Sequence, residues 1–179
     1  MSTWLSEKEF RQSGAESAGV TINVAFLQEI KSDFGFRELL NDVYQQLIPG
    51  SKPGVLDDES AGQVSPRVAA ELLEELRDGL ETYFSLEEFY GYFQQAAVLN
   101  PCVGQKATSL QTEHEVLFLK LNQIVEMTQQ IVYHEVGPET TLTQVAEDLE
   151  AFCIDLAQHE QAEMDLMMRL CNEDIGDGG

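Results

Sequence analysis

Two histidines and two glutamates interrupt rows of hydrophobic residues at positions where helical spacing would place them inside a protein core. His159 and Glu163 lie one helical turn apart in the clearest of these rows, and Glu87 and His114 interrupt two earlier ones. A buried carboxylate is costly unless it is paired or bound to a metal ion. Imidazole and carboxylate together form a ligand set for iron, manganese or zinc. The four residues therefore predict either a metal site or a buried network of His–Glu pairs.

The elements that must position these residues are four long amphipathic segments. Helices are expected over about residues 21–47, 66–99, 105–134 and 140–171. Thr21 or Asn23 could cap the first, Ser65 caps the second with Pro66 at its first helical position, and the fourth begins at Thr140 or Thr141. No segment alternates with period two for long, so strands are not expected. The pattern predicts an all-α, antiparallel up-down-up-down four-helix bundle over residues 21–172, between an N-terminal arm (1–20) and an acidic tail (173–179).

Position along the chain places the four polar residues at one depth of this bundle. Glu87 and His114 lie nearly equal distances before and after Pro101. His114 and His159 lie nearly equal distances before and after Gly137. Because every residue of a helix adds the same rise, residues equally far from a short turn reach the same height. The four side chains are therefore expected to form one buried level, called the polar layer.

The first helix leaves two registers open. Glu29 or Asp33 faces the core if the buried row is Phe36, Leu40, Val43 and Leu47. Both acids face outward if the buried row is Leu27, Ile30 and Phe34. Gly35 could let the helix slip between the two registers. Glu29 and Asp33 are therefore candidate ligands from the first helix, without a choice between them.

Tyr83 lies one turn before Glu87 on the same predicted face, so its ring is expected in the core beside the polar layer. Its phenol could coordinate a metal as phenolate, or stay neutral and donate a hydrogen bond to a carboxylate. Glu160, the sequence neighbour of His159, is expected on an outward face.

The overall composition restricts the partners and the compartment. The net charge is −22, from 32 acidic and 10 basic residues, which disfavours nucleic acid and anionic membranes as partners. No apolar run is long enough to cross a bilayer, and the N-terminus lacks the features of a secretory signal. Three cysteines without a CxxC pair favour free thiols over disulfides or a structural zinc site: Cys102, Cys153 and Cys171. A cytoplasmic protein is expected.

Four stretches of the chain resemble the hemerythrin-like (HHE cation-binding) family. FLQEIKSDFGFRELL is similar to the family's first helix, LRDGLETYFSLEEFYGYF to its second, LQTEHEVLFLKLNQI to its third and FCIDLAQHEQAEMDLMMRL to its fourth. The resemblance covers roughly residues 21–175. Its fourth-helix motif is HxxxE at His159 and Glu163, and the ordered combination of four helices is more specific than any single stretch.

The resemblance implies a hemerythrin-like bundle with a non-haem di-iron centre between its helices. Glu87 matches the second-helix carboxylate that bridges two metals in the family, and His114 matches the third-helix histidine. His159 and Glu163 match the fourth-helix ligand pair.

The chain departs from the family pattern at three positions. Tyr83 stands where the second helix of the family carries a histidine, and Phe118 where some members carry a further one. Asp33, with Glu29 a turn earlier, stands where the first helix carries another. The set is therefore poorer in nitrogen and richer in oxygen than the family's, which disfavours reversible oxygen carriage.

The resemblance leads us to expect a metal-binding protein that senses, binds or stores iron or a diatomic gas such as dioxygen or nitric oxide. Non-haem iron, as a di-iron pair, is the expected cofactor, with manganese or zinc as alternatives. A non-enzymatic role is favoured and no catalytic residue is assigned. The competing hypotheses are a metal-free, degenerate bundle that acts as an interaction module, and a di-iron carboxylate oxidase or peroxidase. The oligomeric state stays open, a homodimer included.

Overall fold

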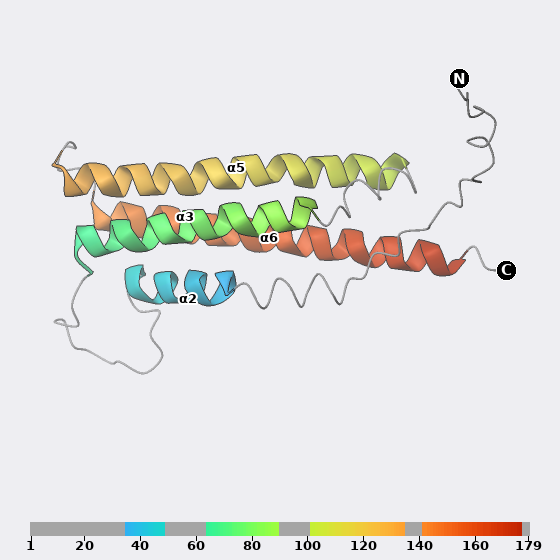
Figure 1. The fold of residues 1–179 in the computed structure, drawn as a ribbon, viewed down its shortest axis with the longest axis horizontal. Helices are drawn as coiled ribbons and strands as arrows, with labels where there is room; N and C mark the ends of the chain where they lie inside the picture. Colours follow the sequence, from blue (N-terminus) through green and yellow to red (C-terminus); the bar gives the residue numbers. More distant parts are fainter. Residues whose placement is uncertain (1–34, 49–63, 90–100, 135–140, 177–179) are drawn as a thin grey trace, which may run out of the picture.

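The computed structural model of the protein describes residues 35–48, 64–89, 101–134 and 141–176 (Figure 1). These ranges are almost entirely helical and contain no strand. Their helices are α2 (Phe36–Leu47), α3 (Pro66–Phe89), α5 (Pro101–Val132) and α6 (Leu142–Gly176). The prediction of an all-α protein is therefore confirmed for the described part of the chain.

Hydroxyl side chains cap the starts of two helices, and the sequence predicts the one at α3. At the start of α3, the backbone N–H of Val68 donates to Ser65 Oγ at 3.4 Å, and Pro66 occupies the first helical position, where no N–H is needed. At the start of α6, the N–H of Gln144 donates to Thr141 Oγ1, also at 3.4 Å. Local side-chain chemistry therefore sets both starting points.

Two helices extend beyond their predicted bounds. α5 begins at Pro101, ahead of the predicted Gln105, because a proline is well accommodated at the first helical position. α6 continues to Gly176, past the predicted end near Cys171.

The first predicted helix is interrupted at Gly35. This residue has φ 67° and ψ 6°, a left-handed conformation that the interior of an α-helix does not contain. An unbroken helix from about residue 21 to residue 47 is therefore wrong at this point, and α2 starts at Phe36. Residues 21–34, which carry the rest of that prediction, lie outside the described ranges.

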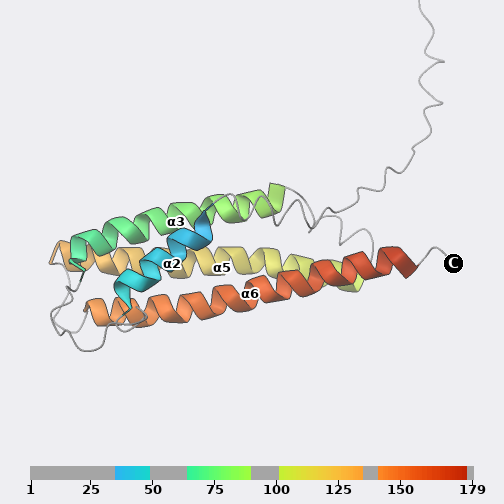
Figure 2. The ribbon, with the colours of Figure 1, turned by 90° about the horizontal axis from the view of Figure 1, so that it is seen from below.

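The four helices pack side by side, with α5 along both α3 and α6 and the shorter α2 across α3 and α6 (Figures 1 and 2). α2 approaches α3 closely at Gly79. A Cβ added there would stand 3.3 Å from a ring carbon of Phe36 and 3.5 Å from a methyl carbon of Leu39. The missing side chain of this glycine lets the two helices meet.

The hydrophobic core consists of two clusters. The larger receives side chains from all four described helices and reaches Leu117 on α5 and Leu156 on α6. The smaller begins at Leu110 on α5 and Leu166 on α6. The polar layer lies between these pairs of leucines, because its residues on α5 and α6 fall between them in the sequence.

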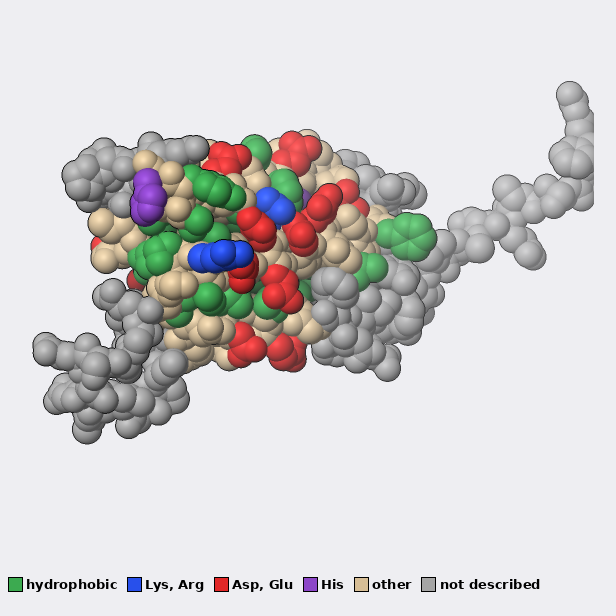
Figure 3. Space-filling view, turned by 60° about the vertical axis from the view of Figure 1, so that its left-hand side comes forward, with side chains coloured by type: hydrophobic (Ala, Val, Ile, Leu, Met, Phe, Trp, Pro, Cys, Tyr) green, Lys and Arg blue, Asp and Glu red, His purple; other side chains and the backbone are tan. Residues whose placement is uncertain are grey.

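The surface of the described residues is strongly acidic. Asp and Glu side chains gather over the middle of the face drawn in Figure 3, among few Lys and Arg. Such a surface raises the local concentration of cations. None of the described helices combines the length and the apolar composition that crossing a bilayer requires.

Candidate metal centre

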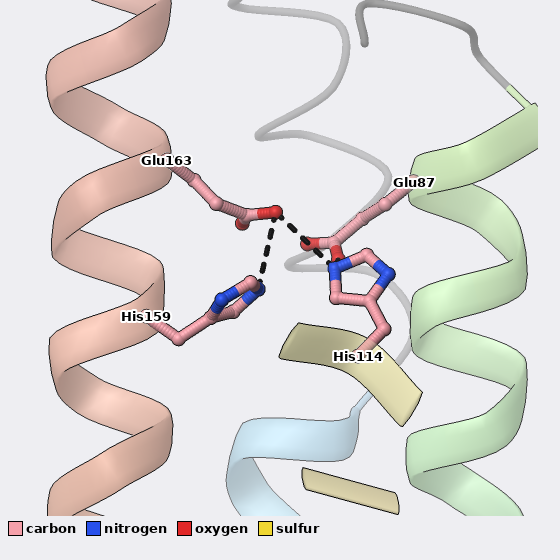
Figure 4. A group of neighbouring side chains, drawn as sticks. All are labelled: Glu87, His114, His159 and Glu163. Atoms are coloured by element: carbon pink, nitrogen blue, oxygen red, sulfur yellow. Dashed lines mark hydrogen bonds and ion pairs between the residues drawn. The ribbon is translucent and has the colours of Figure 1, made fainter. Parts of the chain in front are cut away.

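Four side chains from three helices meet inside the bundle. Glu87 comes from α3, His114 from α5, and His159 and Glu163 from α6 (Figure 4). All four are between 0% and 3% exposed. Each offers one ligand atom, and these atoms lie within 4.8 Å of one another. The structure thus brings together the four residues of the predicted polar layer.

Helical spacing explains why these side chains face the core. His159 and Glu163 lie one turn apart, so both project from the buried face of α6. Glu87 follows Leu80 and Tyr83 on the buried face of α3. His114 lies between two buried leucines on α5.

Short distances link the nitrogen and oxygen atoms at the centre. His114 Nε2 lies 3.2 Å from Glu87 Oε2 and 3.4 Å from Glu163 Oε1. His159 Nε2 lies 3.4 Å from the same Glu163 oxygen. That last contact is close enough for an ion pair but is not aligned as a hydrogen bond, and His159 Nε2 makes none within the described part of the chain. A buried ring nitrogen in this position is suited to donate its lone pair to a cation.

The outer nitrogen of each imidazole contacts a further glutamate. His114 Nδ1 lies 3.1 Å from Glu88 Oε1, and His159 Nδ1 lies 3.1 Å from Glu113 Oε2. These two carboxylates are partly exposed, 42% and 43%, unlike the rings they contact. A carboxylate that accepts the Nδ1 proton leaves Nε2 as the lone-pair nitrogen, and both Nε2 atoms face the centre.

Sequence reasoning did not identify Glu88 and Glu113. Each lies next to a member of the polar layer, and this adjacency is the one signal that could have found them. Both occupy positions that helical periodicity assigns to the surface, where acids are abundant in this chain.

The ring of Phe84 packs against both imidazoles. The ring of Phe84 is stacked on His114, and its edge meets His159 with centroids 5.9 Å apart. The imidazoles themselves meet edge to face, 4.9 Å apart and at 71°. These contacts restrict the rotation of both rings.

The carboxylates around His114 dominate its electrostatics. Burial by itself lowers the pKa of His114, but hydrogen bonds to Glu163, Glu87 and Glu88 outweigh burial and raise the pKa to about 9. Burial likewise lowers the pKa of His159, but the contacts with Glu163 and Glu113 outweigh burial. The net pKa of His159 is therefore raised above its ordinary value. Without a metal, the centre therefore attracts protons, and a cation would take their place.

Tyr83 lies in the core beside the polar layer, as predicted, with 1% of its surface exposed. Its hydroxyl donates to Glu160 Oε1 at 3.0 Å, and its ring is stacked on Phe36 at 4.9 Å. Arg37 of α2 donates to the same Glu160 oxygen at 2.9 Å. The outward position predicted for Glu160 is wrong, because its side chain is only 19% exposed and lies between α2, α3 and α6.

The structure describes only some of the remaining residues that the sequence analysis singled out. Glu29 and Asp33, the first-helix candidates, lie outside the described ranges. The thiol of Cys153 is free and half-buried, and burial, with a smaller effect of Glu150, raises its pKa to about 11. The side chains of Cys102 and Cys171 are not among those described.

Two imidazoles and two carboxylates, buried and converging, form a donor set that fits a metal ion. The set does not by itself select one metal. No family model matches the chain, and neither a curated protein nor a solved structure is significantly similar to it. The hemerythrin-like resemblance therefore rests on the residues that carry it.

Proposed function

We propose that the protein binds a non-haem metal ion through Glu87, His114, His159 and Glu163. One observation carries the proposal: four donor groups from three helices lie in the core with their ligand atoms within 4.8 Å of one another. Two ionised glutamates and two neutral imidazoles also balance the charge of a divalent cation. Without a metal, the charge of the same two carboxylates would have to be neutralised by protonation of the two imidazole rings.

The metal that we propose is iron, and the architecture is that of a hemerythrin-like bundle. The order in which the helices follow and pack, and the alternating direction of the colour gradient along them in Figure 1, support an up-down-up-down arrangement. The HxxxE motif at His159 and Glu163 supports the family. A di-iron pair would need ligands beyond these four, and Glu29 or Asp33 remains the first-helix candidate.

Within that proposal, the chain's own residues bind and shield the metal. Glu87 and Glu163 supply the anionic oxygens, and His114 and His159 the neutral nitrogens. Bound iron would supply a redox-active Lewis acid able to interact with dioxygen or nitric oxide. The role that follows is sensing, binding or storage of iron or such a gas.

Metal analysis of protein purified without chelators tests the proposal. We expect stoichiometric metal in the wild type, and a large loss in Glu163→Gln and His159→Ala, because each change removes one of four ligands. Glu160 is a poor control, because it holds Tyr83 and Arg37. Glu147 is exposed on the same helix, so Glu147→Gln is the matched control and should keep its metal.

A second control addresses histidine. His134 is exposed in the turn after α5 with φ 56°, a conformation that asparagine tolerates, so His134→Asn should also keep its metal. Equal metal content in the ligand variants and the controls would overturn the proposal. A wild type that binds neither iron, manganese nor zinc would favour the metal-free interaction module instead.

A further inference from the structure

The two histidines of the polar layer are held from outside by the same kind of contact. Each ring presents Nε2 to the centre and places Nδ1 3.1 Å from a glutamate oxygen of a neighbouring helix. For His114 this glutamate is Glu88 of α3, and for His159 it is Glu113 of α5. The arrangement repeats between α3 and α5 and between α5 and α6.

The repeat follows a rule in the sequence. Glu88 is the residue after Glu87 on α3, and it reaches His114 on α5. Glu113 is the residue before His114 on α5, and it reaches His159 on α6. A residue adjacent to a ligand is displaced by only about 1.5 Å along the helix axis but is rotated by about 100° around it. Such a residue can therefore reach the Nδ1 side of an imidazole whose Nε2 side faces the centre of the polar layer.

We propose that Glu88 and Glu113 are positioning residues, which fix His114 and His159 with the Nδ1 proton outward and the Nε2 lone pair toward the bound metal. The inference rests on the proposed metal site and assigns two residues beyond its ligands. It is carried by the two matching contacts and by the burial of both rings.

Tautomer selection is the physical reason for such a role. A neutral imidazole carries its proton on either nitrogen, and the hydrogen bond made by one nitrogen decides which form is present. A carboxylate accepts the Nδ1 proton and does not donate one, so it selects the form whose Nε2 is free to bind a metal. The same contact fixes the ring against rotation and makes Nε2 a stronger donor.

A general effect of negative charge is the competing explanation, since any nearby acid would attract a cation. The two explanations differ in what they require of the side chain. Charge alone acts through space from an exposed position, whereas positioning needs an acceptor atom at Nδ1. Exposed acids on the same helices, Glu81 on α3 and Glu115 on α5, therefore separate them.

Equilibrium titration with Zn²⁺ is the first test, on the full chain after metal removal. We expect Glu88→Leu and Glu113→Leu to bind Zn²⁺ about 10- to 100-fold more weakly than the wild type. Glu88→Gln and Glu113→Gln should fall between, because an amide oxygen still accepts the Nδ1 proton but carries no charge. Glu81→Leu and Glu115→Leu remove the same charge and should change the affinity by less than about 2-fold.

Imidazole NMR of the Zn²⁺-loaded, ¹⁵N-histidine-labelled protein is the second test. In the wild type we expect both buried rings to carry the proton on Nδ1 and the metal on Nε2. In Glu88→Leu the signal of His114 should lose its protected Nδ1 proton, while that of His159 stays as in the wild type. Glu113→Leu should show the reverse. A role limited to stability would shift the thermal unfolding midpoint without moving these signals.

The outcomes separate this inference from the proposed function. If the wild type binds neither Zn²⁺, Mn²⁺ nor Fe²⁺, the metal site and the positioning role fall together. If the wild type binds Zn²⁺ and the Glu88 and Glu113 variants match the Glu81 and Glu115 controls, the positioning role alone is overturned. Should a leucine variant fail to fold, the corresponding glutamine variant decides by the same titration and the same Nδ1 signal.

Discussion

The imidazole of His114 lies parallel to the ring of Phe84, with centroids 4.0 Å apart and an angle of 5° between the planes. Phe84 lies one turn before Glu87, so a single helix supplies both a proposed ligand and the surface that holds another. Ring stacking adds about 0.5–1.5 kcal/mol to the burial of such a pair. The stack therefore contributes to keeping His114 Nε2 directed at the centre.

Replacing Phe84 by leucine should weaken metal binding more than it disturbs the fold. Phe84→Leu keeps an apolar side chain but removes the stacked ring, so we expect several-fold weaker Zn²⁺ binding in a titration. Phe152→Leu is the matched control, since Phe152 is buried in the same cluster and, within the described residues, makes no ring contact with His114 or His159. Loss of stability without loss of affinity in Phe84→Leu would contradict the role given to the stack.

The metal-free protein should lose stability as the pH rises through the alkaline range. The folded pKa of His114, about 9, lies above its ordinary value of 6.5. Protonation of His114 therefore contributes stability that is complete below pH 6.5 and is lost as the pH rises through about 9. His159 shifts in the same direction. The contribution of His114 is on the order of 3 kcal/mol.

Urea unfolding of chelator-treated protein at several pH values measures this effect. His114→Gln cannot gain the proton, so the difference in unfolding free energy between wild type and variant should shrink as the pH rises. A difference that stays constant across the range would show that His114 does not hold the extra proton.

Removing the hydroxyl of Tyr83 should leave the metal in place. Tyr83→Phe loses the hydrogen bond to Glu160, which should cost about 0.5–1.5 kcal/mol. Because the hydroxyl donates to Glu160, we expect the iron-loaded variant to have the visible spectrum of the wild type. Tyr44→Phe, on α2, is the control. A charge-transfer band that disappears only in Tyr83→Phe would instead establish phenolate coordination.

Filling the space at Gly79 should push α2 away from α3 without emptying the metal site. Gly79→Leu would overlap Phe36 and Leu39 and should cost about 1–3 kcal/mol. Gly79→Ala should be nearly neutral, since tight contact with Phe36 is offset by about 1 kcal/mol of helix propensity.

Thermal unfolding and metal titration of both Gly79 variants check this expectation. Glu75→Leu, at an exposed position of α3, controls for an added leucine. Because the four proposed ligands come from α3, α5 and α6, Zn²⁺ affinity should survive in Gly79→Leu. Loss of both stability and affinity would mean that the described part of α2 helps to form the site.

The polar layer could be predicted from the sequence because it depends on two regular quantities. The helical period decides that Glu87 and Glu163 face inward, and the constant rise per residue puts them at one height. The supporting contacts depend on side-chain rotamers across helix boundaries, which periodicity does not specify. Glu160 therefore appeared to be a surface residue, although it lies where three helices meet. The sequence does not reveal the helix start at Phe36, because the glycine before it is compatible with both a helix and a left-handed turn.

Along α5 and α6, the polar layer also divides the core into two compartments. Among the described residues, buried hydrophobic side chains do not connect the two clusters, so hydrogen bonds between ionisable groups join them there. Opening of the smaller compartment while the larger stays folded must break those bonds together with the smaller compartment's own apolar contacts, but none of the apolar contacts of the larger one. A bound cation would tie both compartments into one cooperative unit. Amide hydrogens of the smaller compartment would then exchange by local opening without metal and by global unfolding with it.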